Sequence, residues 1–350
     1  MTLAALVVLL SAACTELEGP GDEGWTELGG DRPVLFNSSL AAPVTKSSTL
    51  PDNTTFGVFA FYQPGTSGNP GTWSNSRTPD FMFNQPVLFR LADSPTSSNT
   101  YTYSPTRYWP SNDYNTLTFW AYYPYTATPD FLVANSTDPY TNTSAGIPDI
   151  RFNTDSNTDL MVSDRVENQI YTSNTTNNGV VPLSFSHVLS KIDVKAEKVD
   201  SEGKYTVTLD AVSFKGLYGT AILRNKSGNW ELTGSRQDEV WRAAPTPSPE
   251  LAHETATHIG SAILLPQDLS NDASRLQVEY SVSYTEGGTT HSYSTVRQAY
   301  LRDVFYSIGG GTWTKNSHYV VTLKITPGNP IQFTVTWDTW GADHNYHLSS

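Results

Sequence analysis

Strict alternation of apolar and polar residues near the C-terminus is the feature that most limits the fold. Apolar side chains occupy every second position from Leu276 to Tyr284, and Glu286-Gly287-Gly288 follows as a turn. A second alternating run extends from Tyr319 to Ile325, turns at 327–330 and alternates again from Ile331 to Trp337. Because successive side chains of a strand point to opposite faces, each run predicts a β-hairpin with one buried face. Two such hairpins predict β-sandwich packing.

Earlier segments show the same periodicity. Apolar residues alternate in Leu117–Tyr123 and in Ile192–Ala196, whereas the alternation in Val207–Phe214 shifts by one residue at Ala211. A single inserted residue of this kind predicts a β-bulge. The chain is also rich in Thr, Ser, Asn, Tyr and Trp, which suit strands and polar turns, so we expect an all-β protein.

The length of 350 residues predicts two domains. We expect residues 1–13 to be a signal peptide, 14–31 a flexible tether, 32–218 an N-terminal β-sandwich domain and 219–350 a C-terminal β-sandwich domain. The boundary assumes that the strands around Ile192–Val194 and Val207–Phe214 pair with each other. The Pro-rich stretch 243–249 is the competing boundary.

The single cysteine, Cys14, follows an uncharged apolar run from Leu3 to Ala13 and precedes the acidic residues Glu16 and Glu18. A membrane-spanning helix needs about 20 apolar residues, so this run is too short to span and instead fits the apolar region of a signal peptide. Small residues before a cysteine are typical of a bacterial lipoprotein. We therefore expect Cys14 to carry a lipid that anchors the mature protein in the outer membrane.

Charge and motifs exclude several functions. The net charge is −13 without any basic cluster, so nucleic acid is not an expected partner. His253 and His258 are five apart, whereas a zinc-binding helix needs histidines four apart. Asp155, Asn157 and Asp159 begin like a calcium loop that then lacks its Gly and Glu. No nucleophile accompanies His187, so we expect no enzyme, no metal and no cofactor.

Aromatic residues leave a second function open. Aromatic faces stack on sugar rings, and a carbohydrate-binding surface lipoprotein is the alternative hypothesis, followed by a glycan hydrolase whose paired carboxylates only a structure could identify. Trp109, Trp120 and Trp337 fall within strand patterns, however. Core packing is therefore the first explanation for them.

Seven segments, in order along almost the whole chain, resemble the fimbrillin family, the Mfa-like lipoprotein subunits of type V pili. They are Pro43-Val44-Thr45-Lys46 with Phe56–Tyr62, Phe81–Asn84, Tyr103–Pro110, Leu117–Pro124, Asp159–Val162, Phe185–Ile192, and Trp313–Asn316 with Tyr319. The resemblance implies two transthyretin-like Greek-key β-sandwich domains in tandem. It also implies a surface-exposed location on the outer membrane and in a fimbrium, other pilus subunits as partners, and a host or bacterial surface ligand for adhesion.

In that family a protease cuts after a basic residue beyond the first strand, and the strand of another subunit fills the groove that results. The resemblance places this cut at Lys46, where many members have Arg, and Arg32 is the other candidate although Pro33 follows it. The stalk, anchor, tip and accessory positions in a pilus all stay open. Val34, Leu35 and Phe36 form a short apolar segment that we expect to be the exchangeable strand. Each large side chain that it buries contributes roughly 1.5–3 kcal/mol, so its loss would leave a sandwich that binds a replacement.

Overall fold

The structure is a computed structural model that describes residues 32–40, 50–94, 97–127, 130–171, 179–200, 202–308 and 311–340. Strands form nearly all of its regular structure, as the composition and periodicity predicted. The helical elements in the described residues are short: α1 (Leu301–Val304), η1 (Thr154–Ser156) and η2 (Tyr306–Ile308). None of the helices among these residues is long and apolar enough to cross a membrane.

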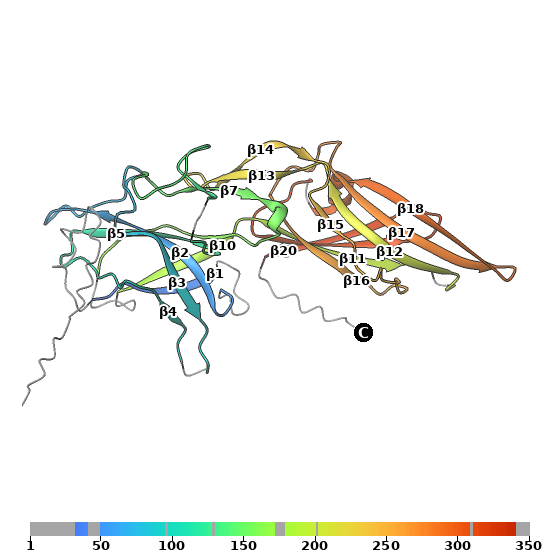
Figure 1. Cartoon of the computed structure of the whole chain (residues 1–350), viewed down its shortest axis with the longest axis horizontal. Helices are drawn as coiled ribbons and strands as arrows, with labels where there is room; N and C mark the ends of the chain where they lie inside the picture. The colour runs from blue at the N-terminus through green and yellow to red at the C-terminus, as the bar shows by residue number, and fades with distance from the viewer. Residues whose placement is uncertain are drawn as a thin grey trace, which may run out of the picture.

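The N-terminal half is built on an eight-stranded sheet with the order β1-β10-β8-β5-β2-β3-β4, in which β9 also pairs with β5 (Figure 1). Its strands are β1 (Leu35–Leu40), β2 (Thr54–Gln63), β3 (Met82–Arg90), β4 (Thr100–Thr102), β5 (Thr116–Tyr123), β8 (Met161–Ser163), β9 (Val166–Gln169) and β10 (Val180–His187). β1 runs parallel to β10, whereas the other pairs in this sheet are antiparallel.

The central strand β5 is buried on both faces. Leu117, Phe119 and Ala121 join one apolar cluster, as their alternation predicted, and Trp120 and Tyr122 join a second cluster on the opposite face. The second cluster also includes residues of a four-stranded sheet with the order β14-β13-β7-β6. Its strands are β6 (Leu132–Val133), β7 (Asp149–Asn153), β13 (Leu217–Arg224) and β14 (Asn229–Gln237).

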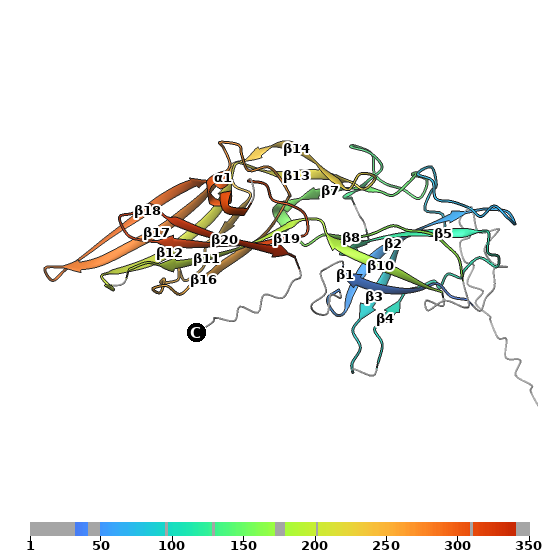
Figure 2. The same cartoon turned by 180° about the vertical axis from the view of Figure 1, so that it is seen from behind.

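The C-terminal half is a β-sandwich of two four-stranded sheets, β16-β11-β19-β20 and β15-β12-β17-β18 (Figure 2). Its strands are β11 (Ser190–Lys198), β12 (Tyr205–Lys215), β15 (Trp241–Ala243), β16 (Thr257–Leu264), β17 (Arg275–Glu286), β18 (Thr289–Tyr300), β19 (Ser317–Ile325) and β20 (Gln332–Thr339). Apolar side chains from both sheets meet in one large core cluster.

Local predictions in this half are confirmed. β17 and β18 form one predicted hairpin, and β19 and β20 form the other. The register of β12 against β17 shifts between Leu209 and Ala211, where the β-bulge was expected. Gly287 and Gly288 both have positive φ, which the tight two-residue turn between β17 and β18 requires.

The predicted pairing of the strands around Ile192 and Val207 is wrong. β11 pairs with β16 and β19, whereas β12 pairs with β15 and β17, so the two strands lie in opposite sheets of the sandwich. The boundary at 218/219, which assumed this pairing, falls inside β13. β13 in turn pairs with β7 from the N-terminal half. Neighbours in sequence were assumed to be neighbours in a sheet, and a sandwich places them in different layers.

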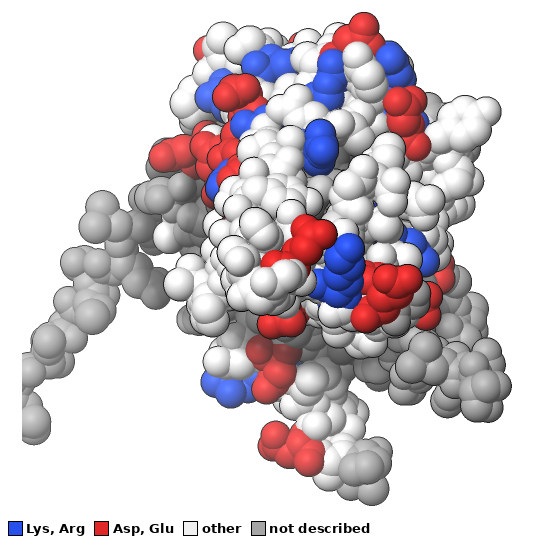
Figure 3. All heavy atoms as spheres, turned by 90° about the vertical axis from the view of Figure 1, so that its right-hand side faces the viewer, with Lys and Arg blue, Asp and Glu red and all other residues white. Residues whose placement is uncertain are grey.

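Figure 3 views the molecule toward the end formed by the C-terminal sandwich. Basic and acidic side chains are interspersed on the described atoms of this face, and uncharged surface separates them. Mixed charges of this kind produce no strong field of one sign. This end of the molecule therefore offers no extended basic surface.

Candidate functional site

β1 occupies one end of the path through the N-terminal sheet. It pairs with β10 over six residues, from Leu35 opposite Val180 to Leu40 opposite Phe185. An end strand has a backbone ladder on one side only, so fewer backbone hydrogen bonds hold it than hold a central strand. The predicted exchangeable segment thus belongs to a strand that extends to Leu40. The strand therefore continues four residues beyond the predicted segment, which ended at Phe36.

Alternate side chains of this segment enter the core. Val34 and Phe36 are 0% and 4% exposed, whereas Leu35 between them is 45% exposed and points away from the core. The ring of Phe36 contacts the rings of Tyr103 and Phe119 edge to face, with centroids 5.5 Å and 6.1 Å away. Burial of Val34 and Phe36 contributes roughly 1.5–3 kcal/mol each, which is a large share of the stability of a domain.

Tyrosine hydroxyls replace a ladder on the other side of β1. The Tyr103 hydroxyl donates to the carbonyl of Val34 at 2.8 Å, and the Tyr101 hydroxyl accepts from the backbone N–H of Ser38 at 2.9 Å. Burial raises the pKa of Tyr103, so this hydroxyl stays a neutral donor. A pocket of about 470 Å³ lies between the start of β1 and β4, with Tyr101 and Tyr103 among its lining residues.

Two backbone hydrogen bonds and one cation–π contact hold the residues just before β1. The N–H of Val34 donates to the carbonyl of Arg107 at 2.9 Å, and the N–H of Trp109 donates to the carbonyl of Arg32 at 2.9 Å. The Arg32 guanidinium lies over the ring of Tyr171, 4.7 Å from its centroid. A cut after Arg32 would leave the whole of β1 in its seat. A cut beyond Leu40 would break the covalent link between β1 and β2, so that β1 could dissociate from the sheet that it completes.

Two predicted sites, Cys14 and Lys46, lie outside the described residues. The described chain ends at Leu40 on one side of Lys46 and resumes at Leu50 on the other. Lys46 therefore follows β1 and precedes β2 in sequence. This order is the one that strand release by a single cut requires.

His187 has a partner that the sequence did not reveal. Its Nδ1 lies 3.0 Å from a carboxylate oxygen of Asp159, and its ring stacks on that of Trp340 with centroids 4.2 Å apart. The sequence does not reveal this pair, because Asp159 is 28 residues away in the chain. Asp159 had been noticed only as part of a calcium-like spacing. His187 is the last residue of β10, and these two contacts hold its ring against Trp340, the residue that follows β20.

The other motifs have structural places. His253 Nδ1 accepts from the N–H of Asp200 at 3.2 Å, and Asn157 caps the turn η1 in the left-handed conformation. Within the described residues, no group of three or more His, Cys, Asp or Glu side chains is placed to hold a metal ion. Trp109 and Trp120 are buried, as core packing predicted, but Trp337 is 56% exposed, so its assignment to the core is wrong.

Comparisons with known proteins match the chain to one protein family. A family model described as fimbrillin-like matches residues 44–340. The fimbrium subunit Fim1C of Phocaeicola vulgatus is 30% identical over an alignment of 246 residues. The match covers 64% of this chain and 61% of that relative, which is less than two thirds of its length.

Solved structures show the same fold. A fimbrial protein from Bacteroides vulgatus has a TM-score of 0.65 at 19% identity, covering 89% of this chain and 100% of that chain. A candidate cell adhesion protein from Bacteroides uniformis has a TM-score of 0.50 at 16% identity, covering 89% and 99%. At these identities the two likenesses concern the fold alone.

Proposed function

Because the chain belongs to the fimbrillin-like family, we propose that it is a fimbrial subunit that assembles on the cell surface by exchange of β1. The family predicted from the sequence is confirmed by these matches. Membership supports a structural role in a fimbrium, at the cell surface and together with other subunits. Assembly by strand exchange, and the contribution to adhesion, are our proposals.

The observation that supports exchange is the seat of β1. Its inward side chains fill the core, its backbone has a ladder on one side, and two tyrosine hydroxyls contact it on the other. Loss of β1 would expose the core residues around Phe56 and Phe119 and leave the edge of β10 unpaired. An extended strand from another subunit could satisfy both needs at once, since it offers backbone partners and alternate apolar side chains.

We also propose that a lipid on Cys14 holds the unassembled subunit at the outer membrane. The apolar run and the small residues Ser11, Ala12 and Ala13 before the cysteine support this anchor. The acidic residues after Cys14 fit export to the outer surface. A surface ligand of a host or of another bacterium would then bind to the assembled fimbrium.

Limited digestion tests the assembly proposal. A lysine-specific protease should cut the purified chain at Lys46, and the trimmed protein should form oligomers that resist dilute detergent. The Lys46→Gln variant is the matched control and should stay monomeric under the same digestion. If the trimmed wild-type chain remains monomeric at high concentration and keeps its thermal stability, β1 is not an exchangeable strand.

A further inference from the structure

The C-terminal sandwich is joined along one side and open along the other. On the joined side, Trp241 of β15 donates its indole N–H to the carbonyl of Ser261 in β16 at 3.1 Å. On the opposite side, within the described residues, β18 pairs only with β17 and β20 pairs only with β19. Two strand edges without a backbone partner therefore flank this side, and α1 and η2, which pack against β18 and β20, close part of the opening between the sheets.

Apolar side chains of β20 point into this opening. Residues directly opposite each other in an antiparallel pair share a face, and three pairs show this: Phe333 with Leu323, Val335 with Val321, and Trp337 with Tyr319. The β19 members are buried in the core, yet Trp337 is 56% exposed because nothing in the described chain covers it. The inward-facing side of β20 is therefore only partly covered, and its uncovered part includes Trp337.

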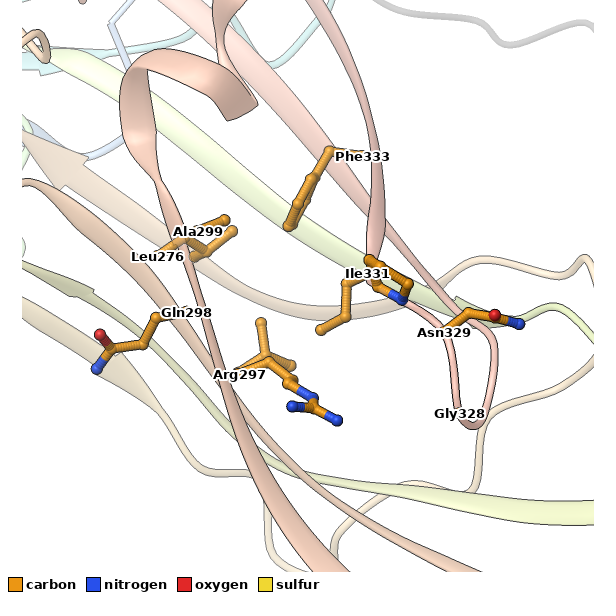
Figure 4. A pocket seen from close by; sticks show the side chains of 10 residues that line it. Leu276, Arg297, Gln298, Ala299, Gly328, Asn329, Ile331 and Phe333 are labelled. Carbon is orange, nitrogen blue, oxygen red and sulfur yellow. The ribbon is translucent and has the colours of Figure 1, made fainter.

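A pocket of about 430 Å³ lies at the start of β20. In Figure 4 the side chains of Ile331 and Phe333 face those of Leu276 and Ala299 across it. The turn at Gly328 and Asn329 forms one rim. The pocket is therefore a slot between the edge of one sheet and the edge of the other, with apolar side chains on facing walls and Arg297, Gln298 and Asn329 also lining it.

The free edge of β18 lacks the features that usually prevent an edge strand from pairing with another chain. It is paired with β17 over twelve consecutive residues without a register shift, and Arg297 is its one Lys, Arg, Asp or Glu residue. The hairpin closes through a two-residue turn, so hydrogen-bonded and non-bonded pairs alternate from Glu286 and Thr289 onward. By this alternation the N–H and C=O groups of Val296 and Gln298 point away from β17. Proline, bulges and lysines, which usually protect such an edge, are absent from β18.

Arg297 supplies a charge to this slot. It lies opposite the buried Val278, so its side chain starts from the inner face, and it lines the pocket. Its guanidinium makes no hydrogen bond or ion pair with any other described residue, although its charge acts on the nearby Tyr293. By contrast, Arg242 of the same sheet is paired with Glu279 at 2.6 Å. A carboxylate in the slot would supply the partner that Arg297 lacks.

We propose that this opening, bounded by β18 and β20, is a docking groove for an extended strand of a partner protein that carries one inward-facing carboxylate between apolar residues. The strand pairs with the free edge of β18 and places its carboxylate on Arg297. Its side chains two residues before and after the carboxylate bury against Ile331 and Phe333. The groove lies in the half of the molecule opposite to β1 and does not depend on the exchange of that strand (Figure 1).

The probe is the nonapeptide Ser-Thr-Val-Thr-Glu-Thr-Val-Thr-Ser-amide with a fluorescent label on its N-terminus, and its binding to the full chain is followed by fluorescence anisotropy. Amide hydrogen exchange should show new protection at Val296 and Gln298 when the peptide is bound. Arg297→Gln should weaken binding about two- to fivefold, as expected for one cross-strand ion pair. The same peptide with Lys in place of Glu should bind to the wild-type protein no more tightly than the Glu peptide binds to Arg297→Gln.

Val296→Pro removes an edge N–H without touching the ladder to β17 and should weaken binding at least tenfold. Val296→Thr keeps that N–H and the side-chain shape and should bind like wild type. The proposal is overturned if the peptide does not bind at millimolar concentration, or if both the proline and the glutamine variants bind it normally. Self-association of the free protein that Val296→Pro abolishes would assign the groove to a second copy and would also overturn the proposal. A Phe36→Ala variant separates the two sites, because it alters the seat of β1 and leaves peptide binding unchanged.

Discussion

Replacing Phe36 with alanine should loosen β1 without affecting the C-terminal sandwich. The side chain is 4% exposed and packs against three aromatic rings, those of Phe56, Tyr103 and Phe119. Truncation of a buried phenylalanine to alanine costs about 3–5 kcal/mol of unfolding free energy. For a unit of 150–250 residues this corresponds to a melting temperature lower by about 6–20 °C.

Leu35→Ala is the matched control for this variant. Leu35 is the neighbouring residue in the same strand, has a side chain of comparable character and is 45% exposed. Its truncation should change the unfolding free energy by about 0.5 kcal/mol or less, as for other surface substitutions. Both variants keep the backbone ladder to β10, so a difference between them reports the inward-facing side chain alone.

Urea unfolding followed by near-ultraviolet circular dichroism measures both variants, and limited proteolysis reports the release of β1. Phe36→Ala should make β1 itself susceptible to proteases at a lower urea concentration than in wild type. Equal destabilisation by Phe36→Ala and Leu35→Ala would refute the reasoning, because β1 would then contribute through its backbone only. Equal stability of wild type and Phe36→Ala would show that the strand does not complete the core.

Three further predictions concern other parts of the chain. Tyr103→Phe removes the hydroxyl that donates to the carbonyl of Val34 and should lower the unfolding free energy by about 0.5–1.5 kcal/mol in urea titrations; no change would mean that this hydrogen bond does not hold β1. Burial of Asp193 alone would raise its pKa, but hydrogen bonds from His318 and Ser261 and the nearby Lys191 hold the pKa well below its usual range. The resulting stability is present above the ordinary carboxyl pKa of about 4 and is lost as the pH falls below it. Asp193→Asn should therefore make the melting temperature decline less steeply as the pH falls. An equally steep decline in the variant and the wild type would contradict this. Cys14→Ala should move the protein from the membrane fraction to the soluble fraction and abolish fatty-acid labelling, and an unlabelled wild-type protein would refute the lipid anchor.

Local sequence patterns predicted those parts of the fold that depend on neighbouring residues. The two hairpins and the bulge at Ala211 follow from alternation and turn residues, because adjacent strands joined by a short turn have few alternatives. The partners of β11 and β12 could not be predicted in this way. Their pairing with β16, β17 and β19 depends on contacts between distant residues, and alternation is the same whichever strand lies alongside.

Burial and side-chain partners were predicted less well than strands. Trp337 alternates like a core residue and does face inward, but it is exposed because β20 is the end strand of its sheet. Periodicity gives the face of a strand and not the material that covers that face. The contact between His187 and Asp159 is likewise invisible in the sequence, since it joins β10 to the segment after η1. For the same reason, Val34 and Phe36 were identified as an apolar segment, whereas the tyrosine hydroxyls that hold its backbone were not.

The composition of β1 bears on the direction of strand exchange. The inward positions of β1 and of the residue before it are Val34, Phe36, Ser38 and Leu40, so one of the four is a small polar residue, and Ser38 is 5% exposed. The Ser38 hydroxyl lies 3.1 Å from the hydroxyl of Tyr101, which compensates for its burial, but it adds little apolar contact. An incoming strand would bury more apolar surface than β1 only if it carried a larger apolar residue that fits at this position. The resident strand is also part of the same chain, which gives it a high effective concentration that an incoming strand must overcome. If the proposed exchange takes place, cleavage beyond Leu40 would remove the covalent link to β2 and with it this advantage of β1.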